Sequence, residues 1–182
     1  MRPVSFLTQK VPHQLRQHED GTTIVYQRLF GLILDGKVFS ASHRFESVAS
    51  DDSVSMYFEN PQNSGKDAYI VAIEIVSTGK FWIDIYRGNT VTTHGTSVTP
   101  ANLNLSSSNT PACKVEYGGT YTAGTLAHQS VAPGGSHLRA IGSIVEVGES
   151  VVISPGDNLL IVATNKSASS EDMSIRIIWW EE

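Results

Sequence analysis

The chain is poor in charged residues, and its few cations are scattered along it. Only 17% of its 182 residues are Asp, Glu, Lys or Arg, and the formal net charge at pH 7 is −5. An average soluble domain has about 25% charged residues. Because contacts to phosphate groups need clustered Lys and Arg, the sequence predicts no nucleic-acid partner.

Long apolar runs and cysteine pairs are missing as well. The longest apolar patch near the start, LFGLIL at 29–34, is far shorter than the roughly 18 residues of a membrane span. The opening MRPVSFLTQKVPHQ lacks the apolar centre of a signal peptide, so we expect neither a membrane segment nor a signal peptide. Cys113 is the single cysteine. It cannot form a disulfide within the chain, and without a His/Asn partner pattern it is predicted to be a small buried hydrophobe rather than a nucleophile.

The motifs of common enzyme classes are also absent. The sequence holds no G-x-S-x-G, P-loop or G-x-G-x-x-G pattern. Among six histidines, His128 and His137 flank a glycine-rich loop with no carboxylate between them, which disfavours a cupin-type metal site. Glu74 and Asp84 are interpreted as solvating charges on neighbouring strands rather than as a glycosidase pair. The sequence therefore predicts no enzyme, no metal site and no cofactor.

What the chain does have, from residue 37 onward, is one β-strand pattern after another. In 37–50, Phe39, Ala41, His43 and Phe45 alternate with more polar neighbours, the period of a half-buried strand. His43 is predicted to be a core histidine, with a pH-sensing role as the alternative. No segment after residue 36 has a helical period with caps. Further strands are predicted at 53–61, 68–79, 80–89, 113–118, 120–126, 138–147, 150–153, 158–165 and 173–182.

These strands follow one another with Gly, Pro and Asn turns, which is typical of a sandwich or a barrel. The long connection at 89–112 suits a crossover between two sheets better than a hairpin. We therefore predict an all-β fold, an eight-stranded antiparallel jelly-roll β-sandwich at 37–182 that is preceded by an N-terminal arm at 1–36.

The arm differs from the rest in its prolines, its charges around His18 and the break at Gly21. Its β-branched residues predict a strand at Thr22–Tyr26, and 29–34 fits either a helical turn or a second short strand. Asp35-Gly36 is a turn signal. We expect the arm to pack on a neighbouring subunit or along its own sandwich, and an ordinary first hairpin is the alternative.

The stretch from Thr90 to Leu126 carries almost no charge apart from His94, Lys114 and Glu116. Surfaces that a neighbouring subunit covers often show this, because depleting charge lowers the cost of desolvation. Short polar side chains also stiffen a loop through local turns and lose little rotamer entropy. We predict such turns at Asn102, Asn104, Ser106–Ser108 and Asn109.

The segment TSVTPANLNLSSSNTPACKVEYGGTYTAGTL resembles a pattern in small structural proteins of tailed bacteriophages, where a TPxNLN…SSNT segment precedes a strand, a turn and a T…GT strand. The ending is also similar, with a turn at Pro155–Asp157, a strand that ends in TN, and a last strand with Trp179 and Trp180. The resemblance covers roughly 37–182. It implies a virion component on the head or in the tail, assembled in the host cytoplasm as a trimer.

The expected function is that of a non-enzymatic virion structural protein, a capsid decoration or cement protein that bridges capsid subunits. Its expected partners are two further copies of itself in a homotrimer and the phage major capsid protein or other virion proteins. The arm would supply strand-addition contacts. The alternative is a jelly roll of the tail or fibre base that binds host-surface glycans.

Aromatic residues are central to both hypotheses. A sugar-binding groove would use some of Trp82, Tyr86, Tyr117, Tyr121, Trp179 and Trp180. Because Trp179 and Trp180 are adjacent on a strand, they must point to opposite faces, so one is predicted in the core and the other on an outer face or at an interface. The predicted interface residues are Tyr26, Leu29, Phe30, Asn102, Leu103, Asn104, Tyr117, Tyr121 and Trp180.

Overall fold

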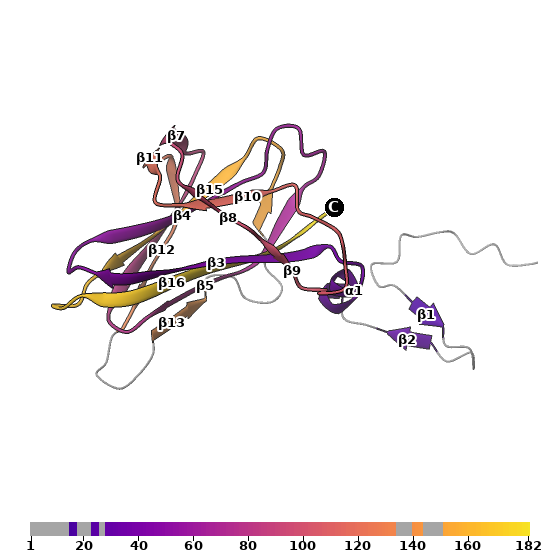
Figure 1. The fold of residues 1–182 in the computed structure, drawn as a ribbon, viewed down its shortest axis with the longest axis horizontal. Coiled ribbons are helices and arrows are strands. Elements are labelled where there is room, and N and C mark those ends of the chain that lie inside the picture. The colour runs from indigo at the N-terminus through magenta and orange to yellow at the C-terminus, as the bar shows by residue number, and fades with distance from the viewer. Residues whose placement is uncertain (1–14, 18–22, 26–27, 134–139, 144–150) are drawn as a thin grey trace, which may run out of the picture.

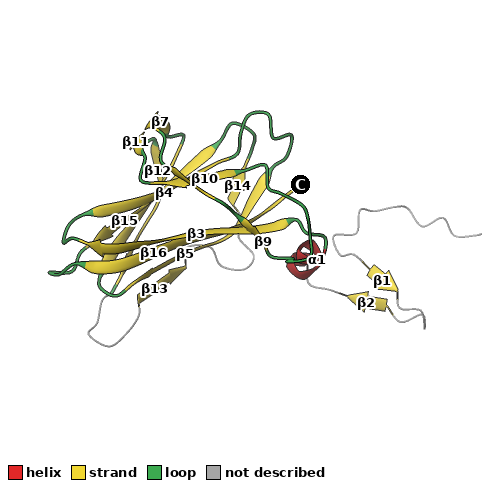
Figure 2. Ribbon diagram, viewed as in Figure 1, coloured by secondary structure: helices red, strands yellow, loops and turns green. Residues whose placement is uncertain are grey.

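The computed structural model of the chain is built almost entirely from antiparallel strands, with one short helix (Figure 1, Figure 2). It describes residues 15–17, 23–25, 28–133, 140–143 and 151–182. The fold is therefore all-β. The helix, α1 (Arg28–Leu34), precedes the main body of strands and lies at one end of it.

The first of two large sheets contains six strands, and every neighbouring pair is antiparallel. We call it the first sheet. In spatial order its strands are β12 (Thr125–Ala132), β6 (Phe81–Arg87), β15 (Asn158–Asn165), β4 (Ser53–Glu59), β10 (Lys114–Tyr117) and β8 (Thr96–Val98).

The second sheet is also antiparallel, and β16 lies at its centre between β3 and β5. The short strand β14 (Val151–Ile153) pairs with β5 on the same side as β13. In spatial order the main strands are β13 (Ala140–Ser143), β5 (Ala68–Ser77), β16 (Glu171–Glu181), β3 (Val38–Val48) and β9 (Ala101–Asn102).

Two small two-stranded sheets complete the described structure. β7 (Thr90–Thr93) pairs with β11 (Thr120–Thr122) over the outer face of the first sheet, where Tyr121 stacks on Tyr57 with ring centroids 4.9 Å apart. Burial and the nearby carboxylate of Glu59 raise the pKa of Tyr57 to about 12. β1 (Leu15–Gln17) pairs with β2 (Thr23–Val25), and this pair lies beyond α1 (Figure 1).

The two large sheets pack face to face on one apolar core. Trp179 of β16 meets Phe58 of β4 edge to face, with ring centroids 5.1 Å apart, and lies 5.9 Å from Phe39 of β3. All three side chains are at most 2% exposed. Burial of these aromatic rings, together with the many aliphatic side chains of the core, holds the layers together.

Several sequence predictions are confirmed here. The alternation of β3 directs Phe39 and Ala41 into the core. Trp179 is fully buried, whereas Trp180 points to the other face and stacks on Tyr69 at 3.9 Å. Cys113 is a buried free cysteine, and burial raises the pKa of its thiol. Of the two structures considered for 29–34, the chain forms the helix.

The structure differs from the sequence prediction in the number and place of its strands. Sixteen strand segments are described where about eight strands were expected. The connection 89–112 contains β7, β8 and β9, and it does cross between sheets, since β8 pairs in the first and β9 in the second. The strand expected at 120–126 is divided between β11 and β12, and β12 continues to Ala132. A register shift between Leu126 and His128 interrupts its alternation, so the sequence pattern did not show this continuation. Of the strand expected at 138–147, only Ala140–Ser143 lies within the described residues.

Glu74 and Asp84 are a further correction. The sequence-based interpretation put them on neighbouring strands, but β5 belongs to the second sheet and β6 to the first. Glu74 pairs with Arg176 at 3.2 Å, and Asp84 accepts a hydrogen bond from Gln129 at 2.8 Å. The two carboxylates thus serve different sheets and cannot face one cleft.

Candidate interaction surface

The weakly charged segment lies largely on the surface. Most residues of 90–112 are exposed, and His94 is the only titratable side chain among them. His94 Nδ1 lies 3.1 Å from a carboxylate oxygen of Glu116 on β10. Apart from this pair, the segment presents hydroxyl, amide and apolar groups, which cost less to desolvate on association than charged groups do.

The predicted local turns in this segment are confirmed. The backbone N–H of Asn104 donates to Asn102 Oδ1 at 2.8 Å, and that of Ser106 donates to Asn104 Oδ1 at 3.1 Å. The N–H of Asn109 donates to Ser107 Oγ at 3.2 Å. Three such turns in succession give the loop a fixed shape without a regular strand or helix.

The same asparagines fasten the loop to the end of α1. Asn104 Nδ2 donates to the carbonyl of Leu34 at 2.9 Å, and Asn102 Nδ2 donates to that of Gly36 at 2.8 Å. Asn109 Nδ2 also reaches the Gly36 carbonyl, at 3.3 Å. These amides satisfy carbonyls that a helix end leaves without partners. The side chains of Asn102 and Asn104, both predicted at an interface, therefore bind the chain's own backbone.

Large apolar side chains are exposed where the loop meets α1. The exposed fractions are 93% for Leu105, 46% for Phe30 and 38% for Leu34. Leu105 follows Asn104, whose amide binds Leu34, so the three belong to one region, which we call the apolar corner. Phe30 was predicted at an interface, and Leu29 beside it is half-buried. Leu105 was not among the predicted interface residues, although a leucine directly before a Ser/Asn run could have indicated an exposed apolar side chain.

The other predicted interface residues are packed within the chain. Leu103 donates its backbone N–H to the carbonyl of Val38. Tyr121 is half-buried against Tyr57. Trp180 is only 5% exposed, and the Arg28 guanidinium lies 4.8 Å from its ring centroid. Tyr26 lies outside the described residues.

The aromatic residues considered for a sugar groove are dispersed over the molecule. Trp82 and Tyr86 are on the outer face of the first sheet, and Trp179 is in the core between the sheets. Tyr117 points inward and stacks on His43 with ring centroids 3.4 Å apart. The structure does not bring these side chains into one groove.

A buried carboxylate fixes the start of β10 against the second sheet. Glu181 is 2% exposed and accepts hydrogen bonds from the backbone N–H groups of Ala112 at 2.8 Å and Cys113 at 3.0 Å. It also accepts one from Trp179 Nε1 at 3.0 Å, while Lys66 Nζ lies 3.8 Å away. We call this the Glu181 clip. It compensates the burial of the charge with several donors.

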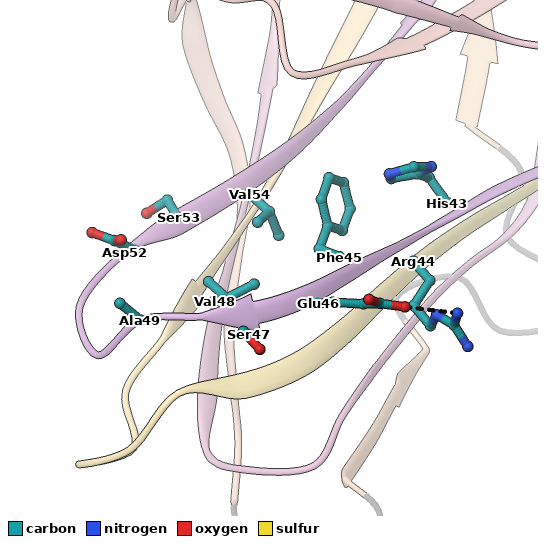
Figure 3. A pocket seen from close by; sticks show the side chains of 10 residues that line it. All are labelled: His43, Arg44, Phe45, Glu46, Ser47, Val48, Ala49, Asp52, Ser53 and Val54. Carbon is teal, nitrogen blue, oxygen red and sulfur yellow. Dashed lines mark ion pairs between the residues drawn. The ribbon is translucent and has the colours of Figure 1, made fainter.

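A cleft of about 610 Å³ opens between the sheets at the turn that joins β3 to β4 (Figure 3). We call it the open-edge cleft. His43, Phe45 and Val54 point into it, whereas Arg44 and Glu46 point outward and form an ion pair at 2.7 Å. Burial lowers the pKa of the His43 imidazole. The residues that line the cleft are His43, Arg44, Phe45, Glu46, Ser47, Val48, Ala49, Asp52, Ser53 and Val54.

The contact between the loop and Gly36 predicts a large effect of a small substitution. Gly36 has a φ of 67°, and a Cβ atom there would lie 2.1 Å from Ser107 Oγ. Gly65 has nearly the same φ, 66°, but a Cβ atom would meet nothing within 4 Å. We expect Gly36→Ala to lower the free energy of unfolding by about 2–3 kcal/mol and Gly65→Ala by about 1–2 kcal/mol. Chemical denaturation of both variants checks this, and equal losses would contradict the close contact with Ser107.

Within the described residues, no three His, Cys, Asp or Glu side chains are grouped as metal ligands. No helix in that part of the chain is long and apolar enough to cross a membrane.

Comparison of the chain with known protein families and with curated proteins finds no match.

Proposed function

We infer that the chain is a non-enzymatic structural subunit of a virion, built on a jelly roll. The strand order supports the fold. Counting β3, β4, β5, β6, β12, β13 with β14, β15 and β16 as strands one to eight, the second sheet has the order 1-8-3-6 and the first 2-7-4-5. Two antiparallel sheets in this arrangement are the pattern of a jelly roll, a fold common in viral capsid proteins.

A structural role is supported by the surface rather than by any reactive group. The exposed and nearly neutral segment 90–112 is stiffened by its own turns and adjoins the apolar corner. Such a surface loses little side-chain entropy when a neighbouring subunit covers it, and it costs less to desolvate than a charged surface does. This combination is the observation that carries the proposal.

A decoration or cement role on the head of a tailed phage rests on the resemblance of the segment 96–126 to virion structural proteins. In this role the chain forms a homotrimer and bridges capsid subunits. The N-terminal arm provides additional contacts to a neighbour.

A tail protein that binds glycans is the second candidate, and one observation favours it. The indole of Trp82 is 45% exposed on the outer face of the first sheet, and the hydrogen-bonded pair of Asp84 and Gln129 lies on the same face. An exposed ring beside hydrogen-bonding groups is a common way to hold a sugar. Lys166 Nζ also lies over this ring, 4.5 Å from its centroid. A glycan array with native chain and Trp82→Ala tests this candidate.

The proposed function is tested on purified particles of the phage that encodes the chain. Quantitative mass spectrometry should find the chain in a fixed ratio to the major capsid protein. In solution, light scattering after size exclusion should give three times the 19.7 kDa of one chain. A chain that is absent from the particles, or that binds glycans only as a tail component, would contradict the decoration role.

A further inference from the structure

The edge of β3 is covered along only part of its length. β9 pairs with Phe39 and Ser40, and no other strand in the described part of the chain pairs with β3 on this side. The carbonyl of Val38 points to this edge, because it accepts the N–H of Leu103. Backbone groups alternate in direction along a strand. The N–H and C=O groups of 42 and 44 therefore point to the same uncovered edge, up to the register shift of β3 against β16 after Phe45.

β4, in the facing sheet, also lacks a described neighbouring strand on one side near the cleft. β10 pairs with β4 only from Met56 to Glu59, so Ser53–Ser55 have no β10 partner. Both sheets thus lack a neighbouring strand beside the open-edge cleft (Figure 3). An extended segment could form a ladder with β3 here and place alternate side chains into the gap between the sheets.

The chemistry of the cleft defines what such a segment would carry. Its lining is mixed, because Phe45, Val48 and Val54 lie beside polar and charged side chains. Acidic groups outnumber cations around it. The acidic residues are Glu46, Asp51, Asp52 and Asp172, and the cations are Arg44, paired with Glu46, and Lys166, paired with Asp51. A matching segment therefore needs apolar side chains at alternate positions together with positive charge.

Residues 1–14, which lie outside the described residues, have this composition. They contain Arg2 and Lys10 and no Asp or Glu, although the whole chain has a net charge of −5. Val4 and Phe6 are two residues apart and would share one face of a strand. Fourteen extended residues span about 46–50 Å, whereas the uncovered part of β3, residues 41–48, is about 26 Å long.

We propose that residues 1–14 of a second copy of this chain add as a strand to the uncovered edge of β3, with Val4 and Phe6 in the open-edge cleft. β1, which follows this segment, lies beyond α1, at the opposite end of the sheets from the cleft (Figure 1). The described strand that follows residues 1–14 thus lies at the opposite end of the molecule from its own cleft. The proposal rests on the inferred role as a self-associating structural subunit and names the surface that receives the arm.

The test is cross-linking between copies of the full-length chain. Because Cys113 is buried, an introduced cysteine is the reactive thiol. One chain carries Thr8→Cys, and the other carries Ala49→Cys at the exposed rim of the cleft. The two chains carry tags of different length, so that a product of two different chains is recognised by its mass. A short bis-maleimide should link the two different chains. The matched control is Ser154→Cys, which is exposed beyond the far end of β4 and should not be linked to Thr8→Cys.

A second variant connects the cross-link to burial of the arm. Adding Phe6→Asp to the Thr8→Cys chain should lower the yield by at least about tenfold, because a buried phenyl ring is lost. Its thermal melting should remain that of the parent chain. A yield at Ala49→Cys no higher than at Ser154→Cys would overturn the proposal. So would a dilution-independent link within one chain that carries both Thr8→Cys and Ala49→Cys, because the arm would then fill its own cleft.

The two proposals fail in different ways. A chain that is absent from virions but cross-links between copies would refute the inferred function and leave the strand addition intact. A chain that is present in virions but gives no specific cross-link would refute the strand addition alone.

Discussion

Glu181→Ala is expected to lower the free energy of unfolding by about 3–5 kcal/mol. The substitution leaves the backbone N–H groups of Ala112 and Cys113 and the Trp179 indole N–H without their acceptor. Each buried donor that loses its partner costs about 1–3 kcal/mol, and a buried charge network broken on one side costs a similar total. Equilibrium denaturation in guanidinium chloride measures the loss.

Glu182 offers a matched control for this experiment, because its side chain is 58% exposed and lies next to Glu181 in the sequence. Glu182→Ala should change the free energy of unfolding by about 0.5 kcal/mol or less. Hydrogen exchange at Ala112 and Cys113 should accelerate only in the Glu181 variant. A loss of less than about 1 kcal/mol for Glu181→Ala would contradict a stabilising role of the Glu181 clip.

The second large effect is expected for Trp179→Ala, at about 3–5 kcal/mol. The indole is fully buried and contacts Phe39 and Phe58 from opposite sheets, so its removal leaves a cavity between the layers. The matched control is Trp82→Ala, whose side chain is 45% exposed and which should cost about 1 kcal/mol or less. Denaturation curves whose slopes are unchanged allow the free energies of unfolding of the two variants to be compared. Similar losses of free energy in both variants would contradict the central packing role of Trp179.

The sequence was informative wherever a local pattern determines the structure. The alternation in β3 and the adjacent Trp179 and Trp180 follow the two-residue period of a strand, and both were predicted correctly. The turns at Asn102 and Asn104 depend on hydrogen bonds to residues only two positions away. Side chains can enforce such contacts without help from the rest of the fold.

Features that depend on distant segments were not predictable in this way. β7, β8 and β9 lack a strong apolar alternation and are held by backbone pairing with strands elsewhere in the chain. Glu181 near the end of a strand looks like a solvated charge, and nothing local shows that Ala112 lies across from it. The same holds for Glu74 and Asp84, whose assignment to different sheets is a property of the strand order alone.

In the candidate interaction surface, too, local features were predictable from the sequence and features that depend on distant segments were not. The low charge of Thr90–Leu126 predicts a surface that a neighbouring subunit covers, and the structure places most residues of 90–112 at the surface of the chain. Individual residues were harder to assign. Asn102 and Asn104 bind the end of α1, and the most exposed large apolar side chain among the described residues is that of Leu105. Which side chains remain free depends on the docking of the loop onto α1, a contact about 70 residues apart in sequence.

The central position of β16 has a consequence for the synthesis of the protein. β16 follows every other described strand, yet it joins β3 to β5, and Arg176 reaches Ser40 across 136 residues. A ribosome therefore delivers β3 and β5 well before the strand that lies between them, and most pairing in this sheet must wait until translation has passed residue 181. Chains that stop earlier retain two unsatisfied strand edges, which chaperones and proteases recognise. The strand order thus makes most of the pairing in the second sheet depend on β16, which is formed last during synthesis.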